Sequence, residues 1–234
     1  MDGIRAQYDK KYLQTLIQYN KVLLQRNALL KYFSKERTYN HDQLMVWDEQ
    51  LIPLGEELYN KRKELVLNLQ DVFQKNYNFI SGGKEPVQLM YNSSLHQNNF
   101  GDLLQKNIQQ DIQRQFTNYG VHKDDLDLFI NDFPVKKFAS QGQQKSYLIA
   151  LKLAQLEFLK LTVGVNPILL LDDVFDKLDE KRVKHLLSLL NSNDFGQIFL
   201  TDTDVNRVKR VVEEIDMPNT VFQVSNGNVQ SVEF

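Results

Sequence analysis

The sequence predicts an α/β fold that is preceded by two long antiparallel helices. Between residues 8 and 75, glycine and proline occur only at Pro53 and Gly55, and apolar side chains recur at helical spacing. From about Val87, helical patterns alternate along the chain with short segments typical of strands, which are either wholly apolar or apolar at every second residue. A chain of 234 residues can bury one sizeable core and a second, smaller module. We therefore expect a helical arm over residues 1–85 and an α/β lobe over residues 86–234.

Two apolar stripes predict the arm. In the second helix an apolar residue stands at every seventh position, namely Leu44, Leu51, Leu58, Leu65 and Val72. In the first helix apolar residues repeat at a spacing of three or four, namely Tyr8, Tyr12, Leu16, Tyr19 and Leu23. Such stripes allow two helices to pair in antiparallel. The polar residues 34–42 are expected to form the tip, and Pro53 to kink the second helix or split it.

The lobe is predicted as strands that alternate with helices. Strands are expected over residues 87–91, 126–130, 167–171 and 197–201, and helices over residues 103–116, 146–161, 180–190 and 205–215. Gly120 is expected to end the first of these helices. Asn226-Gly227 separates two alternating segments and predicts a β-hairpin. The wholly apolar segment 167–171 is typical of a buried parallel strand, which favours an α/β layer structure.

Composition excludes several kinds of protein. The chain contains no cysteine, so disulfides and thiolate metal sites are excluded, and its four histidines lack metal-ligand spacing. The net charge of -2 gives no overall basic signal for nucleic acid, so DNA binding would need a local patch or a dimer cleft. No apolar stretch approaches membrane-spanning length. We expect a cytoplasmic protein without a membrane partner.

Two acids follow the apolar segment Leu169-Leu170-Leu171. A central strand of an α/β fold delivers its last residues to the carboxyl edge of the sheet, where ligands bind. There Asp172 is suited to hold Mg²⁺, and Asp173 to position or deprotonate an attacking water. The alternative is that both acids only end a strand or start a turn, because such strings are common.

A small polar segment, residues 139–145, precedes the helix expected at Ser146. A glycine-containing loop that opens a helix leaves unpaired backbone N–H groups at the positive end of the helix dipole, which is an anion site. Gly142 would let the backbone approach a phosphate, and the Ser140 hydroxyl would donate to it. The alternative is an ordinary helix cap by Ser140, just as Asp179 is expected to cap the helix that starts near Glu180.

Taken together, these segments resemble the motifs of ABC-type ATPases in order and spacing. Residues 139–143 resemble the signature motif, residues 169–173 the Walker B strand, and Leu178-Asp179 the D-loop. Within that group, three strings resemble the RecF family of SMC-like DNA-repair ATPases: Ser140-Gln141-Gly142-Gln143-Gln144-Lys145, residues 171–179 and residues 120–126. The opening residues 7–12 are similar to the start of the RecF arm.

Two departures from these patterns stand out. Asp173 occupies the second Walker B position, where most ABC ATPases have Glu and RecF-like proteins often have Asp. Val121 and Lys123 replace the Pro and Arg that RecF proteins carry in the string 120–126.

The resemblance implies the C-terminal lobe of an ABC-type head that acts as an ATP-dependent homodimer. The signature residues of one chain would contact the nucleotide held by the other; they are Ser140, Gln141, Gly142 and Gln143. Leu178 and Asp179 would bridge the two chains. Within one chain, Asp172 would serve Mg²⁺ and Asp173 the water, and Thr201 and Asp202 are candidates for sensing the γ-phosphate.

No Gly-x-x-x-x-Gly-Lys-Ser/Thr string occurs in the chain. Without that loop there is no cradle for the α and β phosphates of a nucleotide. RecF proteins place the loop in an N-terminal lobe ahead of the arm. ATP binding and hydrolysis are therefore expected only together with such a lobe, and the chain by itself is expected to be inactive.

RecF-like proteins hold duplex DNA near single-strand gaps and, with the RecO and RecR mediators, help to load recombinase. The resemblance implies the same partners here. Basic residues of the lobe are candidates for the DNA contacts: Lys136, Lys137, Arg207, Lys209 and Arg210.

Three alternatives stay open from the sequence. The chain could belong to another SMC-like head, such as that of RecN or an OLD-type ATPase. It could be the ATPase of an ABC transporter, although the extended arm and the two acids argue against this. It could also be a non-catalytic interaction module, whose arm binds a partner while the ATP motifs are inert.

Overall fold

The computed structural model describes residues 1–83, 85–191 and 196–233, which form two compact units. The arm unit consists of Met1–Asp71 and Gln88–Phe129, and the lobe unit of Val72–Val87 and Ile130–Phe234. The units are thus discontinuous in sequence, unlike the predicted domains 1–85 and 86–234. The difference arises because residues 88–129 fold with the arm helices.

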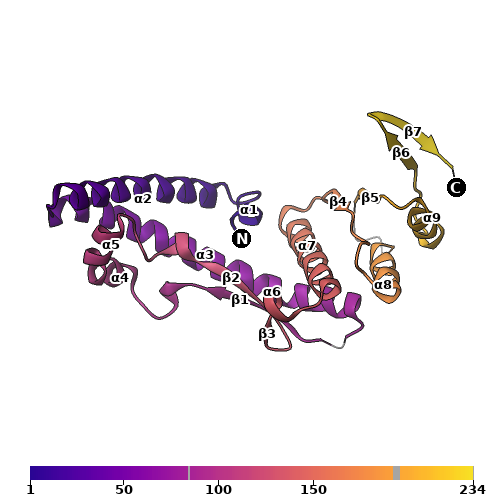
Figure 1. The fold of residues 1–234 in the computed structure, drawn as a ribbon, viewed down its shortest axis with the longest axis horizontal. Coiled ribbons are helices and arrows are strands. Elements are labelled where there is room, and N and C mark those ends of the chain that lie inside the picture. Colours follow the sequence, from indigo (N-terminus) through magenta and orange to yellow (C-terminus); the bar gives the residue numbers. More distant parts are fainter. Residues whose placement is uncertain (84, 192–195, 234) are drawn as a thin grey trace. The chain divides into compact units, whose positions relative to one another are not determined.

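Three helices open the chain: α1 (Asp2–Arg5), α2 (Lys10–Glu36) and α3 (His41–Ser81). α2 begins where the Asp9 carboxylate accepts the Tyr12 N–H at 2.9 Å and ends at Arg37, which has a left-handed φ of 51°. The connection to α3 lies within the predicted tip, and the two helices run side by side (Figure 1). Pro53 lies inside α3 without splitting it.

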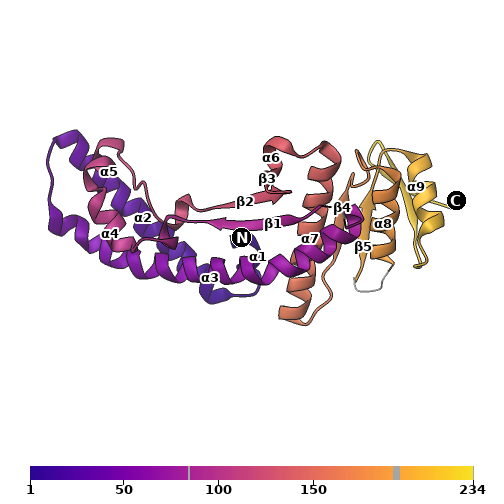
Figure 2. The same ribbon diagram turned by 90° about the horizontal axis from the view of Figure 1, so that it is seen from below.

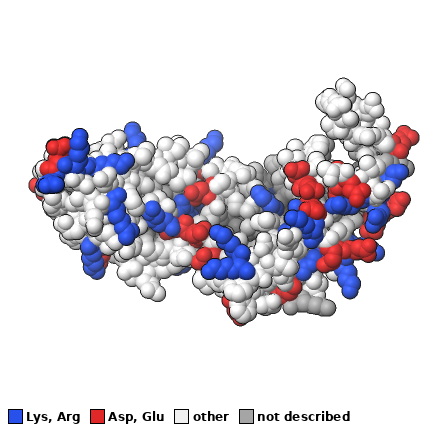
Figure 3. Space-filling view, in the orientation of Figure 1, with Lys and Arg blue, Asp and Glu red and all other residues white. Residues whose placement is uncertain are grey.

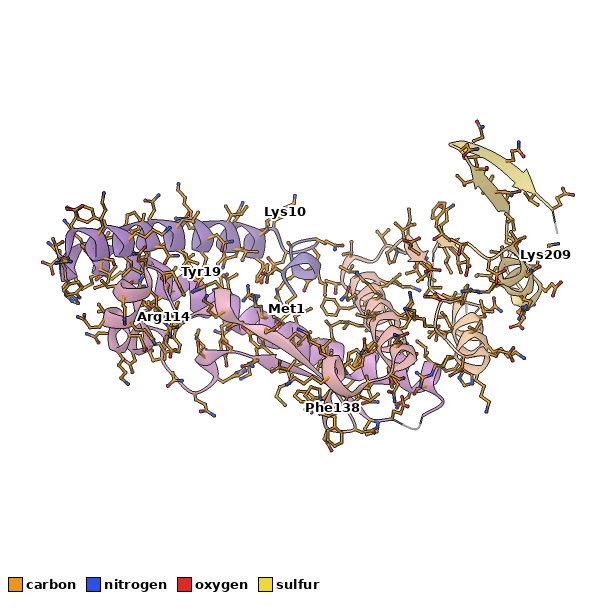
Figure 4. All side chains as sticks on the ribbon, in the orientation of Figure 1. Met1, Lys10, Tyr19, Arg114, Phe138 and Lys209 are labelled. Atoms are coloured by element: carbon orange, nitrogen blue, oxygen red, sulfur yellow. The ribbon has the colours of Figure 1, made fainter. Side chains whose placement is uncertain are left out.

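The predicted stripes pair α2 with α3 in the arm unit. Leu44, Leu51, Leu58 and Leu65 are all at most 1% exposed. Tyr19, labelled in Figure 4, reaches from α2 into the core that contains Leu51 and Leu58. Each fully buried leucine contributes about 1.5–3 kcal/mol to folding, so this seam is a large part of the stability of the arm unit.

Residues 88–129 complete that core. Apart from the end residues Val87 and Ile130, they contain β1 (Val87–Asn92), η1 (Ser94–His96), α4 (Phe100–Lys106), α5 (Ile108–Arg114), η2 (Val121–Lys123) and β2 (Asp125–Ile130). Phe100 and Leu104 of α4 are 1% exposed and join the cluster between α2 and α3. The single helix predicted over residues 103–116 is therefore wrong. Two helices are present instead, separated at Asn107, and α5 is closed by Gln115 in a left-handed conformation.

Gly120 does not end that helix; it precedes η2 with a φ of 127°. A Cβ atom at this position would lie 2.7 Å from the Phe100 ring and 2.9 Å from the Tyr19 hydroxyl. Glycine is needed here for both its backbone conformation and its lack of a side chain. The prediction failed because Gly120 is needed where the backbone passes close to Phe100 and Tyr19. The sequence around Gly120 does not reveal these contacts.

The string 120–126 closes the arm unit through buried polar contacts. The Arg62 guanidinium donates to the Val121 carbonyl at 2.5 Å and lies 3.5 Å from the Asp124 carboxylate, whose side chain is 1% exposed. Tyr91 donates its hydroxyl to the same carboxylate. Because buried charges are tolerated only when paired, these residues tie β1, η2 and α3 to one another.

The lobe unit contains the last part of α3 and the remaining elements. They are β3 (Phe133–Pro134), α6 (Val135–Phe138), α7 (Gln141–Val163), β4 (Leu169–Asp172), α8 (Glu180–Leu190), β5 (Ile198–Thr201), α9 (Val205–Glu214), β6 (Val221–Ser225) and β7 (Asn228–Val232). β1 and β2 of the arm unit are neighbours in one sheet. The predicted hairpin is confirmed: Asn226 and Gly227 both have positive φ and join β6 to β7.

β4 and β5 pair in parallel, and α7, α8 and α9 gather around them (Figure 2). Leu169 and Leu171 point to the covered face of this pair and are 6% exposed. On the opposite face Leu170 lies next to Phe199 in the register, and both are exposed. The alternation places the last residue of β4, Asp172, on this open face.

Candidate functional site

The first turn of α7 carries the signature residues. α7 starts at Gln141 rather than at the predicted Ser146, so the expected loop is already helical from its third residue. Ser140 is the N-cap: its hydroxyl oxygen accepts the Gln143 N–H at 3.3 Å, while the Gln143 side-chain oxygen accepts the Ser140 N–H at 2.8 Å. This capping box explains the early start, because it satisfies two backbone donors of the first turn.

The cap and the anion site are compatible. The Ser140 hydroxyl accepts in this contact, which leaves its own proton available for an acceptor. The N-terminus of a helix of 23 residues also carries the positive end of its dipole. The arrangement therefore suits a phosphate oxygen at the N-terminal end of α7.

The signature turn touches the segment that follows the Walker B strand. A Cβ atom on Gly142 would lie 3.1 Å from the Lys177 carbonyl oxygen. Any residue other than glycine would therefore push the backbone at Lys177 slightly away from the first turn of α7. The Lys145 ammonium donates to the Asp173 carbonyl at 2.9 Å. The structure thus brings two of the predicted motifs together within the lobe unit.

Asp172 and Asp173 stand exposed at the carboxyl edge of the β4–β5 pair. Asp172 is opposite Thr201 in the register, and the Thr201 hydroxyl donates to its carboxylate. Asp173 has a φ of 47°, and its N–H donates to the Thr201 carbonyl at 3.1 Å. A non-glycine residue in this conformation is uncommon, and here the backbone bond to β5 holds it.

The donors at this edge fit Mg²⁺ as part of a site. The Asp172 carboxylate and the Thr201 hydroxyl are hard oxygen ligands, which Mg²⁺ prefers. Over the described part of the chain, no group of three His, Cys, Asp or Glu side chains could hold a metal ion. Mg²⁺ at this edge would therefore need phosphate oxygens and water as its other ligands, as is usual for this ion.

The two residues proposed to sense the γ-phosphate have different surroundings. Thr201 joins Asp172 at the open edge. The Asp202 side chain is 0% exposed, accepts the Asp204 N–H at 2.8 Å and lies 3.3 Å from the Arg207 guanidinium. The structure therefore brings Thr201, but not Asp202, to the two acids.

Leu178 and Asp179 precede α8, as predicted for the D-loop. The Asp179 carboxylate caps α8 by accepting the Arg182 N–H at 2.9 Å. Leu178 lines a groove of about 410 Å³ between α8 and α9, together with Arg207 and Arg210. Asp179 itself stays exposed, which leaves its carboxylate accessible to a partner.

Known proteins resemble this chain over nearly its whole length, although no family model matches it. It is 47% identical over 224 residues to the DNA replication and repair protein RecF of Flavobacterium johnsoniae, which covers 96% of the chain. It is 44% identical over 230 residues to the RecF of Phocaeicola vulgatus, which covers 98%. The chain belongs to the RecF family. It spans 62% and 61% of the length of these two relatives.

RecF membership agrees with the fold. A solved structure described as the recombination mediator protein RecF-ATP in the RecFOR pathway matches with a TM-score of 0.81 at 28% identity. The match covers 99% of this chain and 61% of that one. The lobe is thus an α/β lobe of the ABC-type head, and α2 and α3 form its antiparallel helical arm.

The predicted DNA contacts of this RecF chain come from two elements of the lobe unit. Lys136 and Lys137 are exposed on α6, beside Phe138, which is 64% exposed and labelled in Figure 4. The other three candidates, Arg207, Lys209 and Arg210, lie on α9, where Arg207 is engaged with Asp202. Figure 3 shows acidic side chains interspersed with basic ones over α8 and α9 on the face drawn, so α9 is a weaker candidate than α6.

Sequence reasoning missed a polar network behind the signature turn. Glu85 accepts a hydrogen bond from the Tyr77 hydroxyl at 2.5 Å and from the Gln143 amide at 2.8 Å, and it lies 3.4 Å from Arg182. Burial acts to raise the pKa of Glu85, but the hydrogen bonds and the charge of Arg182 together hold it below its ordinary value. No local pattern could have found this network, since 97 residues separate Glu85 from Arg182.

Proposed function

We propose that this chain supplies the signature, Walker B and D-loop parts of a RecF-type ATPase that dimerises when ATP binds. One observation carries the proposal: the capped start of α7 and the acids after β4 are both exposed and lie within one unit. Each has the chemistry to engage a nucleotide, yet the chain contains no Gly-x-x-x-x-Gly-Lys-Ser/Thr loop. These facts are reconciled if a P-loop lobe, which the RecF resemblance implies, holds the ATP and two chains share it.

In this arrangement the signature turn of one chain contacts the nucleotide that the other chain holds. The Ser140 hydroxyl donates to the γ-phosphate, and the backbone N–H groups of Gln141 and Gly142 face it from the helix end. The Gln143 side chain is occupied by Glu85 and by the Ser140 N–H. Its contribution is therefore to hold the turn, and its backbone N–H is taken up by the cap.

The acids after β4 act on the nucleotide of their own chain. When bound, Mg²⁺ would neutralise developing phosphate charge, held through Asp172 with the help of Thr201. Asp173 orients the attacking water and accepts its proton, although its side chain is one methylene shorter than the Glu of most ABC ATPases. Leu178 and Asp179 contact the partner chain.

The wider role follows the family. We propose that ATP-driven closure of the dimer holds duplex DNA near gaps, and that RecO and RecR type mediators then help to load recombinase. Support comes from the curated relatives named as DNA replication and repair proteins and from the solved RecF-ATP structure of the RecFOR pathway. A cytoplasmic location is part of the same proposal. Thr201 and Asp202 remain proposed sensors, the former with better support.

The test uses the complete gene product that contains this chain. Ser140→Arg puts a bulky cation at the N-terminal end of α7 and should abolish ATP-dependent dimerisation and DNA retention. Asp173→Asn should slow ATP hydrolysis by about 10²-fold or more and prolong DNA retention, because the water loses its base. Dimerisation is followed by light scattering, and DNA retention by a filter or surface assay.

Ser188→Arg is the matched control, since Ser188 is an exposed position on α8 outside the proposed site. It should leave dimerisation and DNA retention unchanged. If neither Ser140→Arg nor Asp173→Asn alters any ATP-dependent property, the ATP motifs are inert. The chain would then be an interaction module, and the present proposal would be wrong.

A further inference from the structure

We infer that Arg182 and Glu85 are positioning residues for the signature turn, and that ATP-dependent pairing of two chains depends on them. Neither residue belongs to the signature, Walker B or D-loop motifs. The inference rests on the proposed function, because it concerns how one chain presents its signature turn to the nucleotide of another. It is carried by two sets of contacts that converge on the first turn of α7.

The first set starts at Arg182. One guanidinium nitrogen donates to the Ser146 hydroxyl at 2.8 Å, and Ser146, which is 0% exposed, donates in turn to the Gly142 carbonyl at 2.8 Å. The Nε atom of the same guanidinium lies 3.3 Å from the Asp179 carboxylate. Arg182 thereby joins the signature turn to the cap of α8. The planar fork of arginine allows these contacts at once, which a lysine ammonium would not.

The second set starts at Glu85. Its carboxylate accepts the Gln143 Nε2–H at 2.8 Å and faces Arg182, while the oxygen of the same Gln143 amide accepts the Ser140 N–H. Tyr77 donates to Glu85 from the last part of α3. Glu85 thus fixes the side chain that closes the capping box around Ser140.

Both groups are shielded from solvent. The side chain of Arg182 is 14% exposed and that of Glu85 is 18% exposed. Charge-assisted hydrogen bonds in such surroundings are stronger than exposed ion pairs, and removal of one partner leaves the other unpaired. Loss of either residue should therefore loosen the start of α7 relative to the cap of α8, and misplace Ser140.

The first measurement compares dimerisation with nucleotide binding in the complete gene product. Arg182→Ala should weaken ATP-dependent dimerisation by about tenfold or more, which corresponds to loss of one strong polar contact. Binding of ATP to the single chain should stay within about twofold, because the signature turn serves the nucleotide of the other chain. Glu85→Gln should act in the same direction. Lys181→Ala, which removes an exposed cation from the same turn of α8, is the control.

Mixed dimers then show on which side Arg182 acts. An Arg182→Ala chain mixed with an Asp172→Asn chain forms one composite site whose Walker B acids and signature turn are both intact. ATP turnover should therefore return in this mixture. A mixture of Arg182→Ala with Ser140→Arg contains no such site, because both chains have a defective signature turn, and it should stay inactive.

The reciprocal result would overturn the inference. If Arg182→Ala is rescued by Ser140→Arg and not by Asp172→Asn, Arg182 supports the Walker B side of its own chain. Absence of rescue in both mixtures, or normal dimerisation of Arg182→Ala alone, would also contradict it. Arg182→Lys replaces Arg182→Ala in every mixture if the alanine variant does not fold, as judged by thermal unfolding.

A separate mixture tests the proposed function on which the inference rests. Ser140→Arg with Asp172→Asn must recover turnover, since it too contains one intact composite site. If that mixture stays inactive, the shared site itself is wrong and the inference fails with it. If it is active while Arg182→Ala gives no rescue, only the role of Arg182 is refuted.

Discussion

In its neutral form His122 has a single possible tautomer in this structure. Its Nε2 atom lies 2.9 Å from the Thr117 carbonyl oxygen, which can only accept, so Nε2 must carry the proton. The Nδ1 atom then accepts the Tyr19 hydroxyl at 2.8 Å. Burial lowers the pKa of His122 below its ordinary value of 6.5 and is the largest cause of the shift. The surroundings of the ring thus favour its neutral form where η2 meets α2.

This lowered pKa predicts a pH dependence of stability. Below pH 6.5 the unfolded chain binds a proton at His122 before the folded chain does, so unfolding is favoured. The contribution of His122 should be fully present above pH 6.5 and decline as the pH falls toward the folded pKa. Urea unfolding of this chain between about pH 7.5 and pH 5 measures the free energy of unfolding across that window.

His122→Gln supplies the comparison, because it can keep a donor but has no titratable group in this range. The difference in unfolding free energy between the parent chain and the variant should shrink as the pH falls from 7.5. Carboxylates titrate in both proteins and cancel in that difference. A difference that stays constant over the window would show that His122 is not held neutral by its surroundings.

Asp179 caps α8 and is also proposed to contact a partner chain. Asp179 accepts the Arg182 N–H at 2.9 Å and so satisfies a backbone donor at the helix start. Its carboxylate is 63% exposed, in the position that the D-loop resemblance assigns to the contact between chains. Capping needs only a side-chain oxygen, whereas an ionic contact with a partner needs the charge.

Substitutions at Asp179 should separate the two. Asp179→Ala should lower the free energy of unfolding by about 1 kcal/mol, since the cap is lost. Asp179→Asn keeps an oxygen for the cap and should stay within about 0.5 kcal/mol of the parent chain. In the complete gene product, Asp179→Asn should nevertheless weaken ATP-dependent dimerisation. Equal dimerisation of the parent and Asp179→Asn proteins would limit Asp179 to capping.

The β4–β5 pair leaves an apolar face open in this chain. Leu170 is 72% exposed and its register neighbour Phe199 is 50% exposed, with Ile168 at 60% beside them. Apolar side chains that gather on one open face of a sheet favour association, unlike single exposed ones. The contrast is with Leu24, which is 68% exposed on the outer side of α2.

The chain by itself should therefore self-associate as its concentration rises. The double variant Leu170→Ser with Phe199→Ser removes the paired apolar side chains and should shift the chain toward monomer in sedimentation velocity. Leu24→Ser removes one leucine of similar exposed fraction on α2 and should not. If the double variant associates as strongly as the parent chain, the open sheet face is not the cause.

Among the described residues, no helix is both long enough and apolar enough to cross a membrane. Charges are spread over both units, and Figure 3 shows Lys, Arg, Asp and Glu side chains on each. Any ATP-dependent contact with DNA must therefore be local, as with Lys136 and Lys137 on α6.

The sequence pattern was enough to predict the structure where a residue's role depends on residues close to it in the chain. The heptad of Leu44 and Leu51 marked the buried side of α3, and Asn226-Gly227 marked the final hairpin. The apolar composition of the strand that ends in Asp172 predicted burial, which holds for the face of Leu169 and Leu171 but not for the face of Leu170. The RecF family itself was recognisable from such short strings.

The sequence by itself therefore determined the element types, the order of the motifs and the family. Tertiary structure decided which elements pack together and how the site is supported: residues 88–129 fill the seam of the arm, and Glu85 meets Arg182 behind the signature turn. The spacing of apolar residues indicates that one face of a helix is buried, but it does not indicate which element covers that face. A polar pair joined across 97 residues leaves no periodic trace at all, because its partners meet only once the chain has folded.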